Sequence, residues 1–311
     1  MFKRSGIFVL CAALAAVFLL SCSERKKSAA QNGKITVMTS IVPLKYLAER
    51  IGGGHVSGEV MVPKGSDPHD FAPTPSLIME LSKAKIFFTA GMPFEKQILK
   101  KITGSGLNTL IVDSSTGIVR RHISHEEEEH DGHGHDEGEH ENLDPHVWNS
   151  IPNLKIIAKN ICDALCKESP QYSEEFRKNL LALDAELTEI QNDISKILAP
   201  FKGRTFYVFH PAFGYFADSC GLKQKAIESE GKSPTPKQLA AIIAMAEKEK
   251  VSIIFVSPQF PVKSAEAIAS AIHGAVVKID PLPSDPVANF RETALAIKKS
   301  FSTEKEKVRE K

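Results

Sequence analysis

Apolar runs of strand length alternate with segments of helical spacing in the first third of the chain. The runs rich in Val, Ile and Phe are residues 34–41, 56–63, 85–91 and 108–115, and the helical segments between them are 42–53, 74–84 and 93–104. The alternation resumes after Pro200 with residues 204–210, 212–221, 222–229, 235–250, 251–258, 263–274 and 275–280, and it ends in an amphipathic segment from about Asp285. Strands that alternate with helices in this way predict parallel α/β units.

One segment in the middle of the chain keeps helical spacing over a longer stretch than the others. Residues 171–199 carry apolar side chains at helical spacing and contain neither Gly nor Pro before Pro200. At about 1.5 Å per residue such a helix is on the order of 40 Å long, enough to join two lobes. The pattern predicts two similar α/β lobes with parallel sheets, at residues 34–168 and 200–311, joined by a rigid helix at 169–199. A ligand site is expected in the cleft between the lobes.

The N-terminus differs in kind from the rest of the chain. Two basic residues precede an apolar run at residues 6–20, which is too short to span a membrane comfortably, and the sequence LLSC then ends at Cys22. This order predicts a secretory signal of the bacterial lipoprotein type at residues 1–21, with Cys22 acylated and residues 22–33 as a flexible tether. The alternative is an ordinary cleaved signal with an incidental cysteine. Both alternatives predict an extracytoplasmic protein, and lipidation would anchor it to the membrane.

Composition and cysteine content further narrow the class of protein. The 311 residues are 42% hydrophobic and 25% charged with a formal net charge of +1, as in an ordinary globular chain. No strongly basic stretch occurs in the folded part, which argues against a nucleic-acid partner. Cys162, Cys166 and Cys220 form no convincing disulfide framework, and the first two, four apart on a predicted helix, are interpreted as small buried apolar residues. A bridge from one of them to Cys220 remains open.

Residues 122–140 have an extreme composition. Six of the eleven histidines fall in this stretch, together with eight acidic residues. The histidines are His122, His125, His130, His133, His135 and His140. So polar a stretch cannot bury enough apolar surface to offset its ordering entropy, so we expect a loop whose composition suits metal ions. We interpret this loop as an accessory, multi-site metal collector beside a tighter site, and the alternative is a solvated acidic spacer.

Three other histidines lie next to proline. His69 and His146 each end an Asp-Pro-His triplet, and His210 is followed directly by proline. Each falls just after a predicted strand or before a predicted helix, and proline restricts the backbone that holds the imidazole. His55 and His273 lack this context and are interpreted as structural. The three proline-flanked histidines are the candidate metal ligands.

Asp280 is the fourth candidate ligand. It ends the predicted strand 275–280, and ligands gather at the carboxyl ends of strands in open α/β sheets. A turn residue or a helix cap is the alternative role for this aspartate. Three neutral imidazoles and one carboxylate form a four-coordinate set that suits Zn²⁺. Manganese prefers more oxygen and ranks lowest in the Irving–Williams order, so the donor set predicts zinc over manganese.

At these motifs the chain resembles the zinc-binding proteins of bacterial zinc and manganese ABC transporters, in particular the ZnuA-like branch. The resemblance is carried by the histidine-rich loop and by TSIVPLKYLAERIGG, VPKGSDPHDFAPTPS, LDPHVW, HPAFGYFA, SPTPKQLAAII, IIFVSPQF and IDPLP. It implies two lobes linked by a rigid helix, with a metal held between them by His69, His146, His210 and Asp280. The segment PLPSDPVANF departs from the usual pattern, so Asp285 or water could supply the fourth ligand instead.

The resemblance also implies a function. It predicts a monomeric, high-affinity zinc-binding component of an ABC transporter, which delivers Zn²⁺ to an inner-membrane permease with a cytoplasmic ATPase. A manganese- or iron-binding homologue is the alternative within the family. A zinc hydrolase is the alternative from another class, but HEEEEH at residues 125–130 lacks the HExxH spacing and no nucleophile elbow is present. A third alternative is an adhesin or metal-buffering lipoprotein. We therefore expect a binding protein and not an enzyme.

Overall fold

A computed structural model of the chain describes residues 33–103, 108–123, 143–228, 235–260 and 262–309. Residues Ile35–Lys311 form one compact unit, and this unit contains two four-stranded sheets. The strand orders are β2-β1-β3-β4 and β6-β5-β7-β8, and all paired strands are parallel. The two sheets therefore repeat one topology, which confirms the predicted α/β class with parallel sheets.

The first sheet is built from residues 35–113. Its strands are β1 (Ile35–Thr39), β2 (Val56–Val60), β3 (Ile86–Thr89) and β4 (Leu110–Asp113). The intervening elements are α2 (Val42–Gly52), the 3-10 turn η1 (Gly53–His55), α3 (Pro75–Leu81) and α4 (Pro93–Thr103). The Thr74 hydroxyl accepts a hydrogen bond from the Leu77 amide and so caps α3, and proline at the first turn is pre-organised for a helix. All of β3 is buried, as expected for a strand covered on both faces.

The second sheet is built from residues 205–278. Its strands are β5 (Thr205–Val208), β6 (Lys223–Ala226), β7 (Ile253–Val256) and β8 (Ala275–Lys278). The accompanying helices are α7 (Gly214–Cys220), α8 (Pro236–Lys248), α9 (Val262–Ala271) and the C-terminal α10 (Pro286–Arg309). Thr235 and Gln238 form a capping box at the start of α8, which satisfies amides that the helix leaves unpaired. The predicted alternation of strands and helices is therefore present in both halves.

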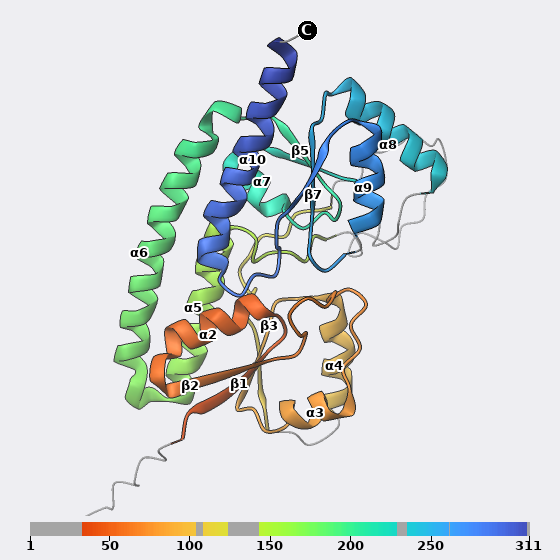
Figure 1. Cartoon of the computed structure of the whole chain (residues 1–311). Helices are drawn as coiled ribbons and strands as arrows, with labels where there is room; N and C mark the ends of the chain where they lie inside the picture. Colours follow the sequence, from red (N-terminus) through yellow and green to blue (C-terminus); the bar gives the residue numbers. More distant parts are fainter. Residues whose placement is uncertain (1–32, 104–107, 124–142, 229–234, 261, 310–311) are drawn as a thin grey trace, which may run out of the picture. The chain divides into compact units, whose positions relative to one another are not determined.

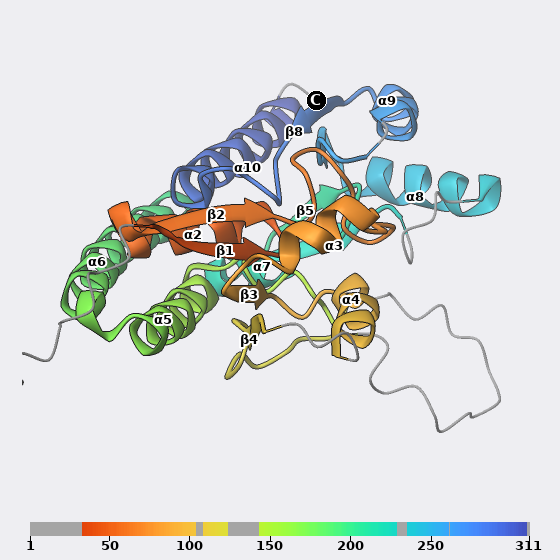
Figure 2. The same cartoon turned by 90° about the horizontal axis from the view of Figure 1, so that it is seen from below.

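The two sheets are connected by α5 (Ile151–Glu168), η2 (Pro170–Tyr172), α6 (Ser173–Leu198) and η3 (Ala199–Phe201). The long helix α6 has 26 residues, so it is about 40 Å long and confirms the predicted linking helix. It packs against α2 and α5 on the side of the first sheet and against α7 and α10 on the side of the second (Figures 1 and 2). The exact lobe limits at residues 34, 168 and 200 remain predictions.

One hydrophobic core includes residues of both sheets. Val37 and Phe87 of the first sheet belong to the same buried cluster as Phe206 and Phe255 of the second. A smaller cluster, which includes Ile268 of α9, lies on the other face of the second sheet. Burial of apolar surface therefore stabilises both sheets and the connecting helices together. Among the described helices, none combines the length and the apolar character that a bilayer span requires.

The candidate ligands lie in loops that follow strands. His69 follows β2, His146 follows β4 and lies five residues before the start of α5, and His210 follows β5 by two residues. The carboxyl ends of parallel strands meet at one edge of a sheet, which is where α/β proteins bind ligands. The fold therefore places all three histidines at ligand-binding edges.

Candidate metal centre

The two Asp-Pro-His triplets adopt the same local structure. Asp67 Oδ1 accepts a hydrogen bond from the backbone amide of His69 at 2.8 Å, and Asp144 Oδ1 accepts one from the amide of His146 at 3.0 Å. Aspartate side chains that bond the backbone two residues onward stabilise turns. The aspartate of each triplet therefore fixes the backbone that carries the histidine, and proline restricts it further.

His210 is held by the second sheet. Its ring stacks on Phe260 with a centroid distance of 4.5 Å, and its Nδ1 atom is hydrogen-bonded to the carboxylate of Glu228. Glu228 follows β6, the neighbour of β5, and its amide bonds to the carbonyl of Phe209 at 3.0 Å. The pairing of β5 with β6 thus brings a carboxylate to the histidine.

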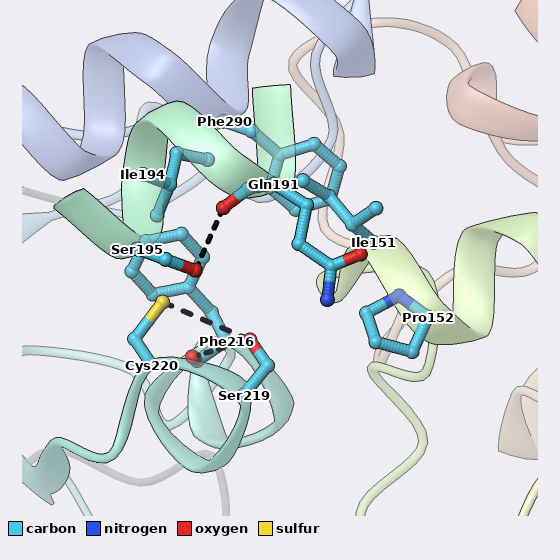
Figure 3. A pocket seen from close by; sticks show the side chains of 9 residues that line it. All are labelled: Ile151, Pro152, Gln191, Ile194, Ser195, Phe216, Ser219, Cys220 and Phe290. Atoms are coloured by element: carbon cyan, nitrogen blue, oxygen red, sulfur yellow. Dashed lines mark hydrogen bonds between the residues drawn. The ribbon is translucent and has the colours of Figure 1, made fainter. Parts of the chain in front are cut away.

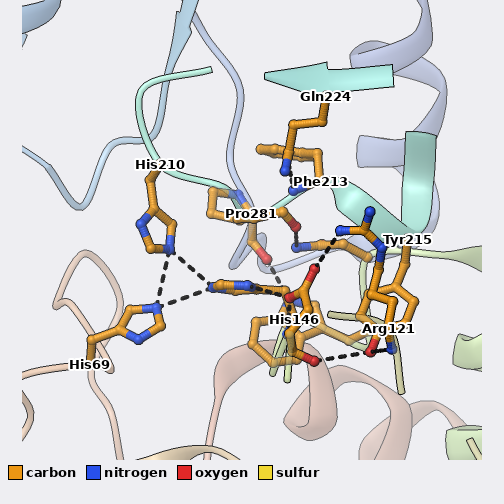
Figure 4. A network of polar contacts seen from close by, with 12 residues as sticks. His69, Arg121, His146, His210, Phe213, Tyr215, Gln224 and Pro281 are labelled. Carbon is orange, nitrogen blue, oxygen red and sulfur yellow. Dashed lines mark hydrogen bonds and ion pairs between the residues drawn. The ribbon is translucent and has the colours of Figure 1, made fainter. Parts of the chain in front are cut away.

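The three imidazoles converge on one point. The Nε2 atom of His69 lies 3.1 Å from those of both His146 and His210, and the last two are 3.0 Å apart (Figure 4). Among the described residues these three form the cluster of potential metal-binding side chains. His146 and His210 are only 2% and 5% exposed, so water cannot readily replace a ligand at their nitrogens. Zinc bound at about 2.0–2.1 Å by three imidazoles requires nitrogens at about this spacing.

The hydrogen bonds of the Nδ1 atoms determine the tautomers of His146 and His210, and so the state of their Nε2 atoms. His146 Nδ1 lies 2.8 Å from Asp144 Oδ1, and His210 Nδ1 bonds to Glu228. A carboxylate accepts and does not donate, so both Nδ1 atoms carry the proton and both Nε2 atoms keep a lone pair. Two lone pairs 3.0 Å apart cannot form a hydrogen bond with each other. A cation between them is the group that the arrangement fits, and carboxylates behind metal-binding histidines are the usual support.

The protonation states also suit a metal. Burial, together with the neighbouring imidazoles of His146 and His210, lowers the pKa of His69 from 6.5 to about 2. Burial also lowers the pKa of His210, against the opposing effect of Glu228. Burial alone would raise the pKa of Asp144, but hydrogen bonds from His146 and Arg121 outweigh it and lower that pKa. At neutral pH, His69 and His210 are neutral and Asp144 is ionised, so neither imidazole has to release a proton to bind a metal.

Arg121, which directly precedes the histidine-rich stretch 122–140, contacts this centre. Its guanidinium bonds to Asp144 Oδ2 at 3.1 Å and to Asp218 Oδ2 at 2.8 Å. The hydroxyl of Tyr215 accepts from the Arg121 amide at 3.1 Å and donates to the Asp144 carbonyl at 2.9 Å (Figure 4). Arg121 therefore holds the carboxylate that orients His146, and Tyr215 holds the backbone of the same residue.

The structure does not bring Asp280 into the cluster of three imidazoles. Its Oδ1 atom instead accepts from Gln259 Nε2 at 2.8 Å and from the Leu282 amide at 2.9 Å. The alternative residue, Asp285, accepts from the amides of Val287 and Ala288 and caps α10. A carboxylate as fourth ligand stays a prediction, and the hydrogen bond from the Leu282 amide is of the kind that an aspartate makes in a turn.

The remaining sequence candidates have other surroundings. His122 forms an isolated antiparallel bridge with Leu143, whereas His125, His130, His133, His135, His140 and the lipidation candidate Cys22 lie outside the described residues. His55 stacks on Tyr172 at 3.7 Å, and its Nε2 lies 2.9 Å from a Glu175 oxygen. His55 therefore contacts the start of the linking helix. It lies outside the cluster of three histidines.

The cysteines and a second cavity offer no further metal site among the described residues. Cys162, Cys166 and Cys220 are free thiols, and the first two have their sulfurs 3.9 Å apart. Cys220 lines a mostly apolar cavity between α5, α6, α7 and α10 (Figure 3). Burial raises the pKa of Cys220 to about 11, so it stays protonated. The hydroxyls of Ser195 and Ser219 beside it already donate to backbone carbonyls.

Two supporting residues were absent from the sequence candidates. Asp144 stands in the LDPHVW motif, whose proline and histidine carry the metal-site prediction. Glu228 follows β6 and contacts His210 only because β6 pairs with β5, with Val208 opposite Ala226. The order of strands in a sheet is not visible in one sequence, so only Asp144 carried a local signal.

Three converging imidazoles at the edges of two parallel sheets, two of them buried, define a two-sheet α/β metal-binding protein. Residues 37–299 match the family described as ZnuA, zinc-uptake complex component A, periplasmic. The match covers most of the chain, and the protein belongs to this family.

Individual relatives agree with the family. The zinc-binding lipoprotein AdcA of Streptococcus pneumoniae is 28% identical over 289 residues, which are 92% of this chain and 56% of AdcA. The chain thus spans about half the length of that curated relative. The high-affinity zinc uptake system protein ZnuA of Bacillus subtilis is 31% identical over 278 residues, covering 88% of this chain and 86% of that protein. A zinc-bound crystal structure of a ZnuA deletion mutant is 32% identical with a TM-score of 0.77, over 86% of this chain and 98% of the other.

Proposed function

We propose that this protein is the extracytoplasmic zinc-binding component of an ABC transporter. It captures Zn²⁺ with His69, His146 and His210 and delivers the ion to a membrane permease for uptake. The observation that carries the proposal is the convergence of three Nε2 atoms within 3.1 Å of one another, with a carboxylate on the far side of two of the rings. Membership of the zinc-uptake family supports the same function.

The donor set supports zinc rather than manganese or iron as the cargo. All three groups in the described cluster are imidazoles, and no carboxylate of the described residues belongs to it. Nitrogen-rich sites bind zinc more strongly than manganese or ferrous iron, and zinc accepts four ligands without a geometric preference of its own. The cargo is therefore a single Zn²⁺ ion.

The lining of the site supports capture rather than catalysis. The cavity beside the three imidazoles has a volume of about 10 Å³ and is lined by Trp148, Phe260 and Pro281 among others. A cavity of this size holds one water-sized group. Apart from the three histidines and Gln259, the lining is made of proline, leucine and aromatic side chains, so it offers no further group to act as the general acid or base that a zinc hydrolase would need.

Location and partners follow from the family and the N-terminal sequence. The family is described as periplasmic, and AdcA is named a lipoprotein. We infer that Cys22 carries a lipid, that residues 22–33 tether the folded part to the membrane, and that the protein acts as a monomer. Its partners are a permease and the permease's cytoplasmic ATPase. The histidine-rich stretch 122–140 then serves as an accessory collector of zinc near the main site.

Zinc titration tests the proposal. Calorimetry of the metal-free protein is expected to show one tight zinc site and much weaker manganese binding. His210→Ala should weaken zinc by about 10–100-fold or more, since it removes a ligand and leaves Glu228 without its partner. His55→Ala is the matched control, because His55 lies outside the cluster and should leave the affinity unchanged. Equal affinity in the wild type and His210→Ala would reject the site.

A further inference from the structure

Gln259 lies in the wall of the metal cavity. It follows β7 by three residues, and it lines the cavity together with His69, His146 and His210. Its neighbour Phe260 stacks on the His210 ring at 4.5 Å. Gln259 is therefore placed beside the imidazole cluster by the second sheet, although it belongs to no metal-ligand motif.

The orientation of the Gln259 amide is fixed by Asp280. The amide nitrogen Nε2 donates to Asp280 Oδ1 at 2.8 Å, and the same oxygen accepts from the Leu282 amide at 2.9 Å. A carboxylate accepts hydrogen bonds, so the nitrogen and not the oxygen of the amide must face Asp280. The amide oxygen Oε1 is consequently turned away from Asp280.

The oxygen so placed is buried and has no hydrogen-bond partner among the described residues. Buried polar atoms are nearly always satisfied, and one left alone at a binding site marks the place of a ligand group. Neither a bare zinc ion nor an imidazole lone pair can donate a hydrogen bond to it. A water molecule bound to zinc can, because three imidazoles leave one of the four zinc positions open.

We propose that Gln259 accepts a hydrogen bond from a water molecule that is the fourth ligand of the captured zinc, and that Asp280 positions Gln259 instead of binding the metal. The inference rests on the proposed function. The cavity of about 10 Å³ matches one such water. Amide oxygen is also not among the usual zinc ligands, which favours the water-mediated contact over direct coordination.

Three variants of the full chain test this assignment. Gln259→Met keeps the size of the side chain but removes the acceptor, and Asp280→Asn keeps an oxygen that can accept from Gln259 and Leu282. The control is Gln97→Met, a change of the same kind at an exposed position of α4. Zinc affinity is measured by competition with a chelator. Cobalt(II) replaces zinc as a spectroscopic probe, with added azide to displace an exchangeable water.

We expect Gln259→Met to bind zinc about 10-fold more weakly or worse, the usual cost of losing a supporting contact at a metal site. The zinc affinity of Asp280→Asn should stay within about threefold of the wild-type affinity, because its oxygen still accepts from Gln259. The cobalt spectrum should respond to azide in the wild type and in Asp280→Asn. The metal-free Gln259→Met protein should unfold at the wild-type temperature or above, because the substitution removes an unsatisfied polar atom. A merely structural role would lower both affinity and stability.

Two results would overturn the proposal. One is a Gln259→Met protein with wild-type zinc affinity. The other combines two observations. Azide leaves the spectrum of the cobalt-substituted wild type unchanged, and Asp280→Asn lowers zinc affinity by about 100-fold or more. Together they would make Asp280 the fourth ligand. If the wild type binds no zinc, the proposed function fails as well. If His210→Ala loses zinc while Gln259→Met does not, only the role of Gln259 fails.

Discussion

His146 Nδ1 and Asp144 Oδ1 lie 2.8 Å apart in the interior, and the Asp144 side chain is fully buried. The carboxylate holds the proton on Nδ1, so Nε2 faces the other imidazoles with a free lone pair. The same oxygen also accepts from the backbone amide of His146. One aspartate therefore sets both the backbone position and the tautomer of a metal-binding histidine.

Asp144→Asn should weaken zinc binding by about 10–100-fold. The amide of asparagine can donate to Nδ1 and so place the ring proton on Nε2, where it opposes the metal. Asp218→Asn is the matched control, because Asp218 also bonds to Arg121 but is largely exposed. Competition with a zinc chelator measures both variants. Equal losses in the two variants would mean that the effect arises from Arg121 and not from the tautomer of His146.

The stability of the metal-free protein should fall in acid because of His69. Its pKa is about 2 in the folded protein against 6.5 ordinarily, so below pH 6.5 the unfolded chain takes up a proton that the folded chain does not. This protonation stabilises the unfolded state relative to the folded state, so the free energy of unfolding falls by about 2 kcal/mol at pH 5 for this one histidine. Urea unfolding at pH 7.5 and pH 5.0 measures the difference.

His69→Gln supplies the comparison for this pH effect. Glutamine does not titrate, so the variant should lose about 2 kcal/mol less than the wild type between the two pH values. Protonation of carboxylates such as Asp144 contributes equally to both proteins and cancels. The same loss in both proteins would show that His69 does not carry the depressed pKa.

Trp148 should report zinc binding through its fluorescence. It is the single tryptophan of the chain, it lines the metal cavity, and its ring lies 5.6 Å from that of His146. Binding of a divalent ion to His146 changes the charge beside the indole, so the emission should change and saturate at one equivalent of zinc. Trp148→Phe should show no signal, and His210→Ala should require far more zinc. Saturation at several equivalents would indicate that the signal comes from other sites.

Deleting residues 125–140 should leave the tight site intact. The deletion removes five of the six loop histidines but retains the bridge between His122 and Leu143 and the contacts of Arg121 with Asp144. Calorimetry should lose only weak binding events, as expected for an accessory collector. A longer deletion of residues 121–143 removes Arg121 and should weaken the tight site too. Loss of tight binding in the short deletion would make the loop the principal site, and an unchanged isotherm would make it a mere spacer.

Much of the fold could be predicted because it depends on periodicity. The helical pattern at residues 171–199 corresponds to α6 at Ser173–Leu198, and the strand pattern at 34–41 corresponds to β1 at Ile35–Thr39. The ends of these elements differ from the predicted ends because they depend on local backbone geometry. The turns on either side of α6 are 3-10 and contain proline, so the regular helix is shorter than the apolar pattern.

The site was less predictable because it depends on which strands are neighbours. The three histidines had a local signal in the adjacent prolines, and the structure brings them together. Glu228 and Gln259 had no such local signal, since each approaches the centre only because the strand before it, β6 or β7, pairs with β5. For Asp280, whose role as a ligand stays a prediction, the rule about strand ends has a limited reach. The rule places a residue at the correct edge of the sheet, but it does not determine whether the side chain faces the cavity or the turn.

The bridge between His122 and Leu143 also bears on how such a protein can change over time. Because the bridge holds His122 beside Leu143, the two ends of the interval between them stay fixed, and a change in the length of that interval need not move Arg121 or Asp144. We therefore expect insertions and deletions in this interval to be tolerated better than in the loops that carry His69 or His210. The number of histidines in this interval can then change while the cluster of His69, His146 and His210 stays the same.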